Sequence, residues 1–348
     1  MLKILHAADW HLDAPMPGCS EALRQALDTI PGQIFELVRQ EGCHLVLLSG
    51  DLFDGAYTTH SYQTLYDVLK AMAVPVLIAP GNHDFSGPDS PWLKELWPEN
   101  VHIFKSAQIE SVSLPELNCR VYGAGFESMD APALLEGFRA DCPERYALGV
   151  FHGDPTQPNA PYNPITKVQV SASNLDYLAL GHIHKAGSFF SGKTLCAWPG
   201  CPMGKGYDEQ GEKGVYLVTL GEEASLQFRA LDTPRFYDLQ AQPEDLSGLL
   251  PPVESKDFYR VTLVGACETP DLAQLQAQFS HLPNLVLRDK TTRPVDLWGS
   301  LGEDSFEGIY FSLLRQAMDA APPAQQEEIL LAAKISRQLL EGQEVVLP

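Results

Sequence analysis

The sequence of 348 residues predicts an α/β domain over residues 1–234, then a small α+β cap over 235–300 and a helical segment over 301–348. Three observations support this fold class. Short apolar runs of strand length alternate with segments of helical spacing through the first two thirds of the chain. After Gly200 the pattern changes to a hairpin, a β-α-β segment and amphipathic helices. The length is also sufficient for a large core and more than one domain.

The strands and helices of the first domain follow from these runs. Six segments are expected to form strands: 2–9 (LKILHAAD), 44–51 (HLVLLSGD), 75–82 (PVLIAPGN), 119–125 (CRVYGAG), 146–154 (YALGVFHGD) and 176–184 (DYLALGHIH). Residues 20–40 have helical spacing, with Ser20 as the expected N-cap and Glu21 in the first turn. Residues 61–73 predict a second helix with one apolar side.

The remaining elements are predicted from the last third of the chain. The runs 214–220 (GVYLVTL) and 225–231 (SLQFRAL) are typical of a β-hairpin that closes the first domain. The cap is expected to contain a strand at FYRVTLVG, a helix at PDLAQLQAQFSHL and a strand at LVLRDK. From about Asp304, two amphipathic helices are separated by Pro322 and Pro323, and their apolar faces suggest either core packing or docking of a partner.

Composition restricts the classes of function. The formal net charge of −21 argues against a protein that binds a polyanion unaided, so bound divalent cations or a basic partner would have to supply positive potential. No apolar run approaches the length of about 20 residues that a membrane span needs, and the first residues do not resemble a signal peptide. Seven scattered cysteines suit reduced thiols. We therefore expect a cytoplasmic protein without a membrane partner.

Polar side chains follow five of the predicted strands, at the point where each strand ends. They are Asp9 and His11, Asp51, Asn82 and His83, His152, and His182 and His184. In an open α/β sheet the crevice beyond the carboxyl ends of the strands is the usual ligand site. Imidazole nitrogens with carboxylate and amide oxygens, and no thiolate, suit Mn, Fe or Zn better than Ca or Mg. The sequence thus predicts a metal centre at this edge.

The segment Gly187–Thr194, GSFFSGKT, offers a competing interpretation because it matches the P-loop pattern of nucleotide-binding ATPases. A working P-loop follows a strand and opens a helix, so that backbone amides face the phosphates. Here the segment follows GHIH and is continued by LCAWPG, in which Pro199 prevents a useful helix. We interpret Ser191 and Gly192 instead as the tip of a hairpin between the sixth strand and the next.

The motifs D-x-H, G-D-x-x-D, G-N-H-D, a strand-end His and G-H-x-H, in this order, resemble those of the calcineurin-like metallophosphoesterases. HAADWHLDAP, LLSGDLFDG, PVLIAPGNHD and LALGHIHK are similar to segments of the bacterial SbcD/YhaO-type DNA repair exonucleases, the nuclease subunits of SMC-like ATPase complexes. The resemblance covers about the first 220 residues. It implies a sandwich of two β-sheets flanked by helices.

The resemblance also implies roles for individual residues. Asp9, His11, Asp51 and His184 would hold one metal ion, and Asp51, Asn82, His152 and His182 the other. Mn is the expected metal, with Fe or Zn as alternatives. His83 would be catalytic, donating a proton or hydrogen bond to the leaving group, as suits an imidazole near pH 7. Three further acids are expected to support ligands or turns rather than to bind metal: Asp54, Asp84 and Asp154.

Three functions remain open at this stage. The first is a two-metal phosphodiesterase, an exonuclease or endonuclease, that acts on DNA ends in DNA repair with an SMC-like ATPase subunit. The second is a phosphodiesterase or phosphatase for a small molecule such as a nucleotide, with the same centre. The third is a scaffold that only docks the ATPase. A second copy of the chain, forming a homodimer, is a further candidate partner.

Overall fold

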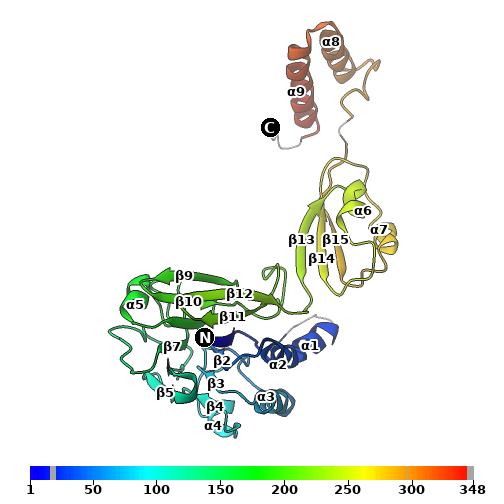
Figure 1. Cartoon of the computed structure of the whole chain (residues 1–348). Helices are drawn as coiled ribbons and strands as arrows, with labels where there is room; N and C mark the ends of the chain where they lie inside the picture. Colours follow the sequence, from blue (N-terminus) through cyan, green and yellow to red (C-terminus); the bar gives the residue numbers. More distant parts are fainter. Residues whose placement is uncertain (16–20, 295, 343–348) are drawn as a thin grey trace. The chain divides into compact units, whose positions relative to one another are not determined.

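The computed structural model describes residues 1–15, 21–294 and 296–342, and in it the chain forms two compact units (Figure 1). The first contains residues 1–237 and 256–258, and the second contains 238–255 and the residues from 259 onward. No helix among the described residues is both long enough and apolar enough to cross a membrane.

Two six-stranded mixed sheets form the centre of the described part of the first unit. The first sheet has the spatial order β12 (Ala224–Ala230), β11 (Gly214–Leu220), β1 (Leu2–Ala7), β2 (Leu45–Leu48), β3 (Val76–Ile78) and β4 (Val101–Ile103). The second has the order β5 (Glu110–Leu114), β6 (Cys119–Gly123), β7 (Tyr146–His152), β8 (Tyr177–Gly181), β10 (Thr194–Trp198) and β9 (Gly187–Ser191). The predicted sandwich is therefore confirmed, and the six predicted strands divide equally between its two sheets.

The sandwich is held together by strands that are apolar on both faces. On β1, the side chains of Leu2 and Ile4 pack in one buried cluster with residues of β6, β7 and β8, whereas those of Leu5 and Ala7 pack in a second cluster with the helices. This alternation follows from the two-residue period of a strand. Parallel strands covered on both faces read as continuous apolar runs, which is why these segments are visible in the sequence.

Helices cover the outer faces of the sheets. Those of the first unit are α1 (Glu21–Asp28), α2 (Ile30–Glu41), α3 (Thr59–Ala71), α4 (Pro91–Lys94) and α5 (Lys167–Ala172), with a 3₁₀ turn at Pro115–Leu117. The single helix predicted over 20–40 is wrong, because the chain breaks at Thr29 and Pro31, which lacks an N–H, stands in the first turn of α2. Glu21 does lie in the first turn of α1, whereas Ser20 lies outside the described residues.

Other boundaries also differ from the prediction. The helix predicted from residue 61 begins at Thr59, because the Thr58 side chain caps it and Ser61 completes the capping box. The predicted hairpin tip at Ser191 and Gly192 is present, but it joins β9 to β10, and β10 runs parallel to β8. Strands β4 and β5 were not predicted, because neither VHI nor ESVSL is a continuous buried apolar run.

Most of a small three-stranded sheet lies in the second unit, and its order is β13 (Phe236–Ala241), β14 (Phe258–Leu263) and β15 (Leu285–Asp289). Strands β14 and β15 are parallel and are connected through α7 (Leu272–Gln278), as the predicted β-α-β unit requires. Strand β13 was not predicted. The short elements α6 (Leu246–Leu249) and a 3₁₀ turn (Pro243–Asp245) connect β13 to β14.

Two helices, α8 (Phe306–Ala320) and α9 (Pro323–Leu340), pack against each other at the end of this unit. Arg337 of α9 is buried between them: it pairs with Glu307 at 2.8 Å, binds Ser300 at 3.0 Å and lies 4.0 Å from the ring centre of Phe311. A buried guanidinium with several partners stabilises one packing arrangement of the helices. The helices thus form a small paired motif with its own partly buried centre.

Candidate metal centre

The eight candidate site residues lie at one edge of the sandwich and are connected to each other by direct contacts. The first sheet contributes the residues that follow β1, β2 and β3, and the second contributes the last residue of β7 and those that follow β8. The contacts that join the sheets are His11–His184, Asn82–His152, Asn82–His182, Asp51–His152 and Asp9–His182. The sequence prediction placed these residues at the edge of one open sheet. In the structure they lie at an edge that both sheets form together.

The backbone of this edge is unusual. Asp9, His11, Asp51 and His182 have positive φ values of 55°, 49°, 53° and 93°. This region is uncommon for residues other than glycine and costs of the order of 1–3 kcal/mol at each position. Gly50, with φ 85°, leads into Asp51, and a Cβ there would lie 2.7 Å from Nδ1 of His152. The turns after the strands thus position these side chains through backbone conformations that are themselves unfavourable.

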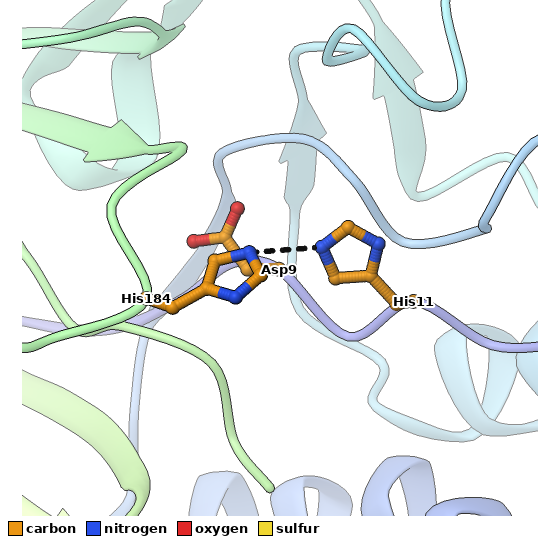
Figure 2. A group of neighbouring side chains, drawn as sticks. All are labelled: Asp9, His11 and His184. Carbon is orange, nitrogen blue, oxygen red and sulfur yellow. Dashed lines mark hydrogen bonds between the residues drawn. The ribbon is translucent and has the colours of Figure 1, made fainter. Parts of the chain in front are cut away.

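One group of side chains consists of Asp9, His11 and His184, whose ligand atoms lie within 4.8 Å of one another (Figure 2). Nε2 of His11 lies 3.1 Å from Nε2 of His184. Oδ1 of Asp9 accepts a hydrogen bond from the His182 N–H, but Oδ2 is buried and has no hydrogen-bond partner among the described residues. A buried carboxylate oxygen without a donor is costly unless a cation satisfies it, so this group fits a metal ion.

A second group contains Asp9, Asp51 and His152, with Asn82 and His182 beside it. Nδ1 of His152 lies 2.9 Å from the carbonyl oxygen of Ser49, which can only accept, so Nδ1 carries the proton. In the neutral ring, Nε2 then directs a lone pair towards Oδ1 of Asn82 at 2.9 Å and Oδ2 of Asp51 at 3.4 Å. Three converging acceptors without a proton between them fit a cation.

Asp51 lies between the two groups. Its Oδ2 is 3.4 Å from Nε2 of His152 and 3.8 Å from Nε2 of His11. Burial alone would raise the pKa of this carboxyl, but the neighbouring His152 and His11 lower it. For His182, burial lowers the pKa to about 4, so its ring is neutral near pH 7 and keeps a lone pair for a metal. The lowered pKa values of Asp51 and His182 therefore favour the deprotonated forms, which can bind a metal ion.

Two carboxylates orient imidazoles of the candidate site. Asp54 lies 3.0 Å from Nδ1 of His11 and 2.6 Å from Nδ1 of His83. Hydrogen bonds from these two rings keep the pKa of Asp54 well below its usual range. Glu209 binds Nδ1 of His184 and also accepts from the Lys205 N–H at 2.7 Å. Such partners fix the ring orientation and raise the basicity of the nitrogen that faces the metal.

Glu209 was missed by sequence reasoning. It lies in the loop after Gly204, far from any strand end and 25 residues beyond His184, so nothing in its spacing indicates its role. Two other acids of the motifs serve the backbone. Asp84 accepts from the N–H groups of Gly81 and Leu52, and burial, followed by the charge of Asp51, raises its pKa to about 7. Asp154 binds the turn at Thr156.

His83 differs from the other imidazoles because 45% of its side chain is exposed. Its ring centre is 4.8 Å from that of His11, and its backbone N–H donates to Oδ1 of Asp51 at 2.9 Å. Distance alone does not exclude it as a ligand, since its ring also lies within 4.8 Å of ligand atoms of His11 and Asp51. The hydrogen bond to Asp54 raises its pKa, however, and favours a protonated, solvent-facing ring.

Replacement of Glu209 by Gln is expected to weaken the binding of one metal ion by about 10- to 100-fold, the usual effect of removing a partner of a ligating histidine. The reason is that Gln cannot match the charge that Glu209 places on Nδ1 of His184. Titration of metal-free protein with Mn²⁺, followed calorimetrically, measures this. Glu212→Gln, at an exposed carboxylate paired with Arg235, is the matched control and should bind Mn²⁺ normally. If both variants bound Mn²⁺ with equal affinity, Glu209 would have no role in the metal centre.

Comparison with known proteins adds to this geometry. A family model described as calcineurin-like phosphoesterase matches residues 2–186. The chain is 33% identical over 234 residues to the uncharacterized metallophosphoesterase YhaO of Bacillus subtilis, which covers 62% of this chain and 57% of that protein. It is 26% identical over 275 residues to SbcD, a subunit of the nuclease SbcCD of the same species, covering 65% of this chain and 68% of that protein.

Among solved structures, a dimetal phosphatase from Danio rerio aligns at 14% identity with a TM-score of 0.46, covering 66% of this chain and 96% of the other. The chain spans a little over half the length of YhaO, at 57%. The family model, by contrast, covers more than half of this chain, including every candidate ligand. The chain therefore belongs to the calcineurin-like phosphoesterase family.

Proposed function

We propose that the protein is a two-metal phosphodiesterase that acts on DNA ends in DNA repair, together with an SMC-like ATPase subunit. The observation that carries the proposal is the grouping of seven candidate ligands at one edge with His83 exposed beside them. The relative named as a nuclease subunit supports DNA as the substrate. We place this activity in the cytoplasm, and the six described cysteines, all free thiols, suit a reducing compartment.

The residues present would divide between two ions. We propose Asp9, His11, Asp51 and His184 for one, and Asp51, Asn82, His152 and His182 for the other, with Mn as the native metal. When bound, such ions neutralise phosphate charge and lower the pKa of coordinated water. They would also offset locally the net charge of −21 that otherwise repels DNA.

His83 would supply a proton that the candidate metal ligands cannot donate. The sugar oxygen that leaves a phosphodiester is basic, so it has to receive a proton as the ester bond breaks. The raised pKa of His83, due to its hydrogen bond with Asp54, keeps that proton available near neutral pH. Its exposure lets a substrate oxygen approach the ring.

One assay separates this function from hydrolysis of a small molecule. Mn-loaded protein should release nucleotides from linear duplex DNA and should also hydrolyse bis-p-nitrophenyl phosphate. A small-molecule phosphodiesterase would turn over only the second substrate. A scaffold without catalysis would turn over neither.

The pair α8 and α9 is our candidate for ATPase docking. The pair buries Phe311 and Ala333 but leaves several apolar side chains exposed: Phe306, Ile309 and Leu313 on α8, and Leu331, Leu339 and Leu340 on α9. Helical apolar side chains at this spacing are typical anchors for a partner groove. The prediction that both faces simply form core is therefore less well supported than docking.

Removal of this helical pair is expected to separate docking from catalysis. Because Leu297 and Ser300 bind Arg337, we place the truncation after Pro294 rather than after residue 300. The truncated protein should keep its metal and cleave bis-p-nitrophenyl phosphate, yet no longer co-purify with the ATPase. Full-length Ile309→Asp should lose the ATPase as well, while Glu327→Gln, at an exposed position, should keep it. ATPase binding at full strength in both disruptive proteins would rule out docking by these helices.

A further inference from the structure

A cavity of about 510 Å³ opens beside His83 in the first unit. Its wall includes Ala56, Tyr57, His83, Phe85, Gly87 and Pro88, and none of the seven candidate metal ligands. The cavity thus contains none of the candidate metal ligands, and it shares His83 and the backbone-binding Asp84 with the site described above. Its volume is in the range of cavities that bind a compound of nucleoside size.

The two aromatic walls are held in place by contacts within the protein. The Tyr57 hydroxyl donates to Glu95 at 2.6 Å, and its ring lies 5.9 Å from the ring of the fully buried Phe53. The position of the Phe85 ring depends on Gly87, whose N–H donates to the Phe85 carbonyl at 2.7 Å. A Cβ at position 87 would lie 2.8 Å from the Phe85 ring, so only glycine leaves that ring where it is. The cavity is therefore formed before any ligand enters.

The charges around the cavity argue against a phosphate as its occupant. None of the described residues that line it is Lys or Arg, and His83 is the only basic side chain among them. Of its two acids, Asp89 is paired with Lys94 at 2.5 Å, and the Asp84 carboxylate accepts from backbone N–H groups. What remains is an aromatic and apolar wall, which suits an uncharged planar ring because bases stack on aromatic faces whatever their sequence.

The position of His83 connects this cavity to the reaction. A proton donor has to come within hydrogen-bond distance of the oxygen that leaves. His83 lines the cavity, and its ring lies 4.8 Å from the ring of His11, a candidate ligand. With the phosphate at the candidate metal ligands, the group bonded to the leaving oxygen would extend past His83 towards the cavity.

We propose that this cavity is a subsite for the base of the nucleoside that carries the leaving oxygen, bound between Tyr57 and Phe85 after it has left its stack. The assignment rests on the proposed phosphodiesterase function and adds the recognition of an unstacked base to it. Unstacking a paired base costs a few kcal/mol and an unpaired base less. Frayed or single-stranded ends should consequently be cleaved faster than blunt ones.

The test compares two dinucleotide diesters that differ only in the leaving nucleoside, which is thymidine in one and abasic deoxyribose in the other. Stacking of one base corresponds to about 5- to 150-fold in kcat/KM, so wild-type protein should prefer the thymidine ester by that factor. In Phe85→Ala the preference should fall towards one. Ala56→Phe, which fills the cavity from an exposed position, should do the same. Phe190→Ala removes an exposed ring on β9 and should keep the full preference.

Metal content and hydrolysis of bis-p-nitrophenyl phosphate are measured for every variant, so that a misfolded protein is recognised. If wild-type protein cleaves bis-p-nitrophenyl phosphate but treats the two dinucleotides alike, the subsite is wrong and the proposed function stands. A preference that survives in both Phe85→Ala and Ala56→Phe would place the base elsewhere. If Mn-loaded wild-type protein cleaves no diester, the proposed function itself fails, and the subsite with it.

Discussion

Asp51→Ala is expected to lose both metal ions and to reduce phosphodiester hydrolysis by more than about 10³-fold. Removal of one group that stabilises charge in a transition state already costs about 10²–10³-fold, and this carboxylate serves two groups of ligands. Oδ2 of Asp51 faces Nε2 of both His11 and His152, so its removal affects both groups of ligands. Metal analysis of the purified variant measures the loss directly.

Two comparisons make this result specific. Asp89→Ala removes an exposed carboxylate that is paired with Lys94, and it should keep both ions. Asp51→Asn retains the side-chain shape and should still lose most of the metal, because an amide does not carry the charge that two cations require. A protein with Asp51→Ala that contained two ions per chain and remained fully active would contradict the two-metal assignment.

His83→Ala should give the opposite combination, with both metals retained and most turnover lost. A general acid typically contributes about 10²–10⁴-fold, and that is the loss expected for DNA. The loss should be much smaller for bis-p-nitrophenyl phosphate, because p-nitrophenolate leaves without needing a proton. Kinetics on the two substrates, with metal content measured in parallel, provide the comparison.

The pH profile gives an independent check on His83. Its hydrogen bond to Asp54 raises its pKa above the ordinary value, so the protonated ring persists to higher pH. The activity that depends on it is complete below this pKa and is lost as the pH rises through it. This alkaline decrease should be absent from His83→Ala and unchanged in His60→Ala, at an exposed histidine near Asp28. Equal losses on both substrates, or an unchanged profile, would argue that His83 does not donate the proton.

The strands and the polar residues at their ends could be predicted because both are local features. A buried parallel strand is a continuous apolar run, and a polar residue directly after it can be located to within one position. The division of the strands between two sheets could not be predicted from such runs. β3 and β8 are both wholly buried, yet they lie in different sheets, because pairing depends on partners far away in the chain.

The parts of the site that sequence reasoning missed come from segments without a regular period. Glu209 reaches His184 from a loop in which no periodicity applies. Similarly, the wall formed by Tyr57 and Phe85 comes from two loops that follow different strands. The break at Thr29 is a different case, since Pro31 was visible in the sequence but the apolar spacing continued across it. The continuous apolar spacing therefore predicted one helix, although the backbone at Pro31 begins a second one.

The left-handed backbone at Asp9, His11, Asp51 and His182 has a consequence for how this protein can change over time. Each of these positions stores conformational energy that the rest of the fold has to supply. Selection for thermal stability alone would favour glycine or asparagine there, and the protein would become more stable while losing the proposed metal ligands. Stability and activity thus compete at the same four positions, so stabilising changes compatible with catalysis should be sought away from this edge, in the sheets and helices that support it.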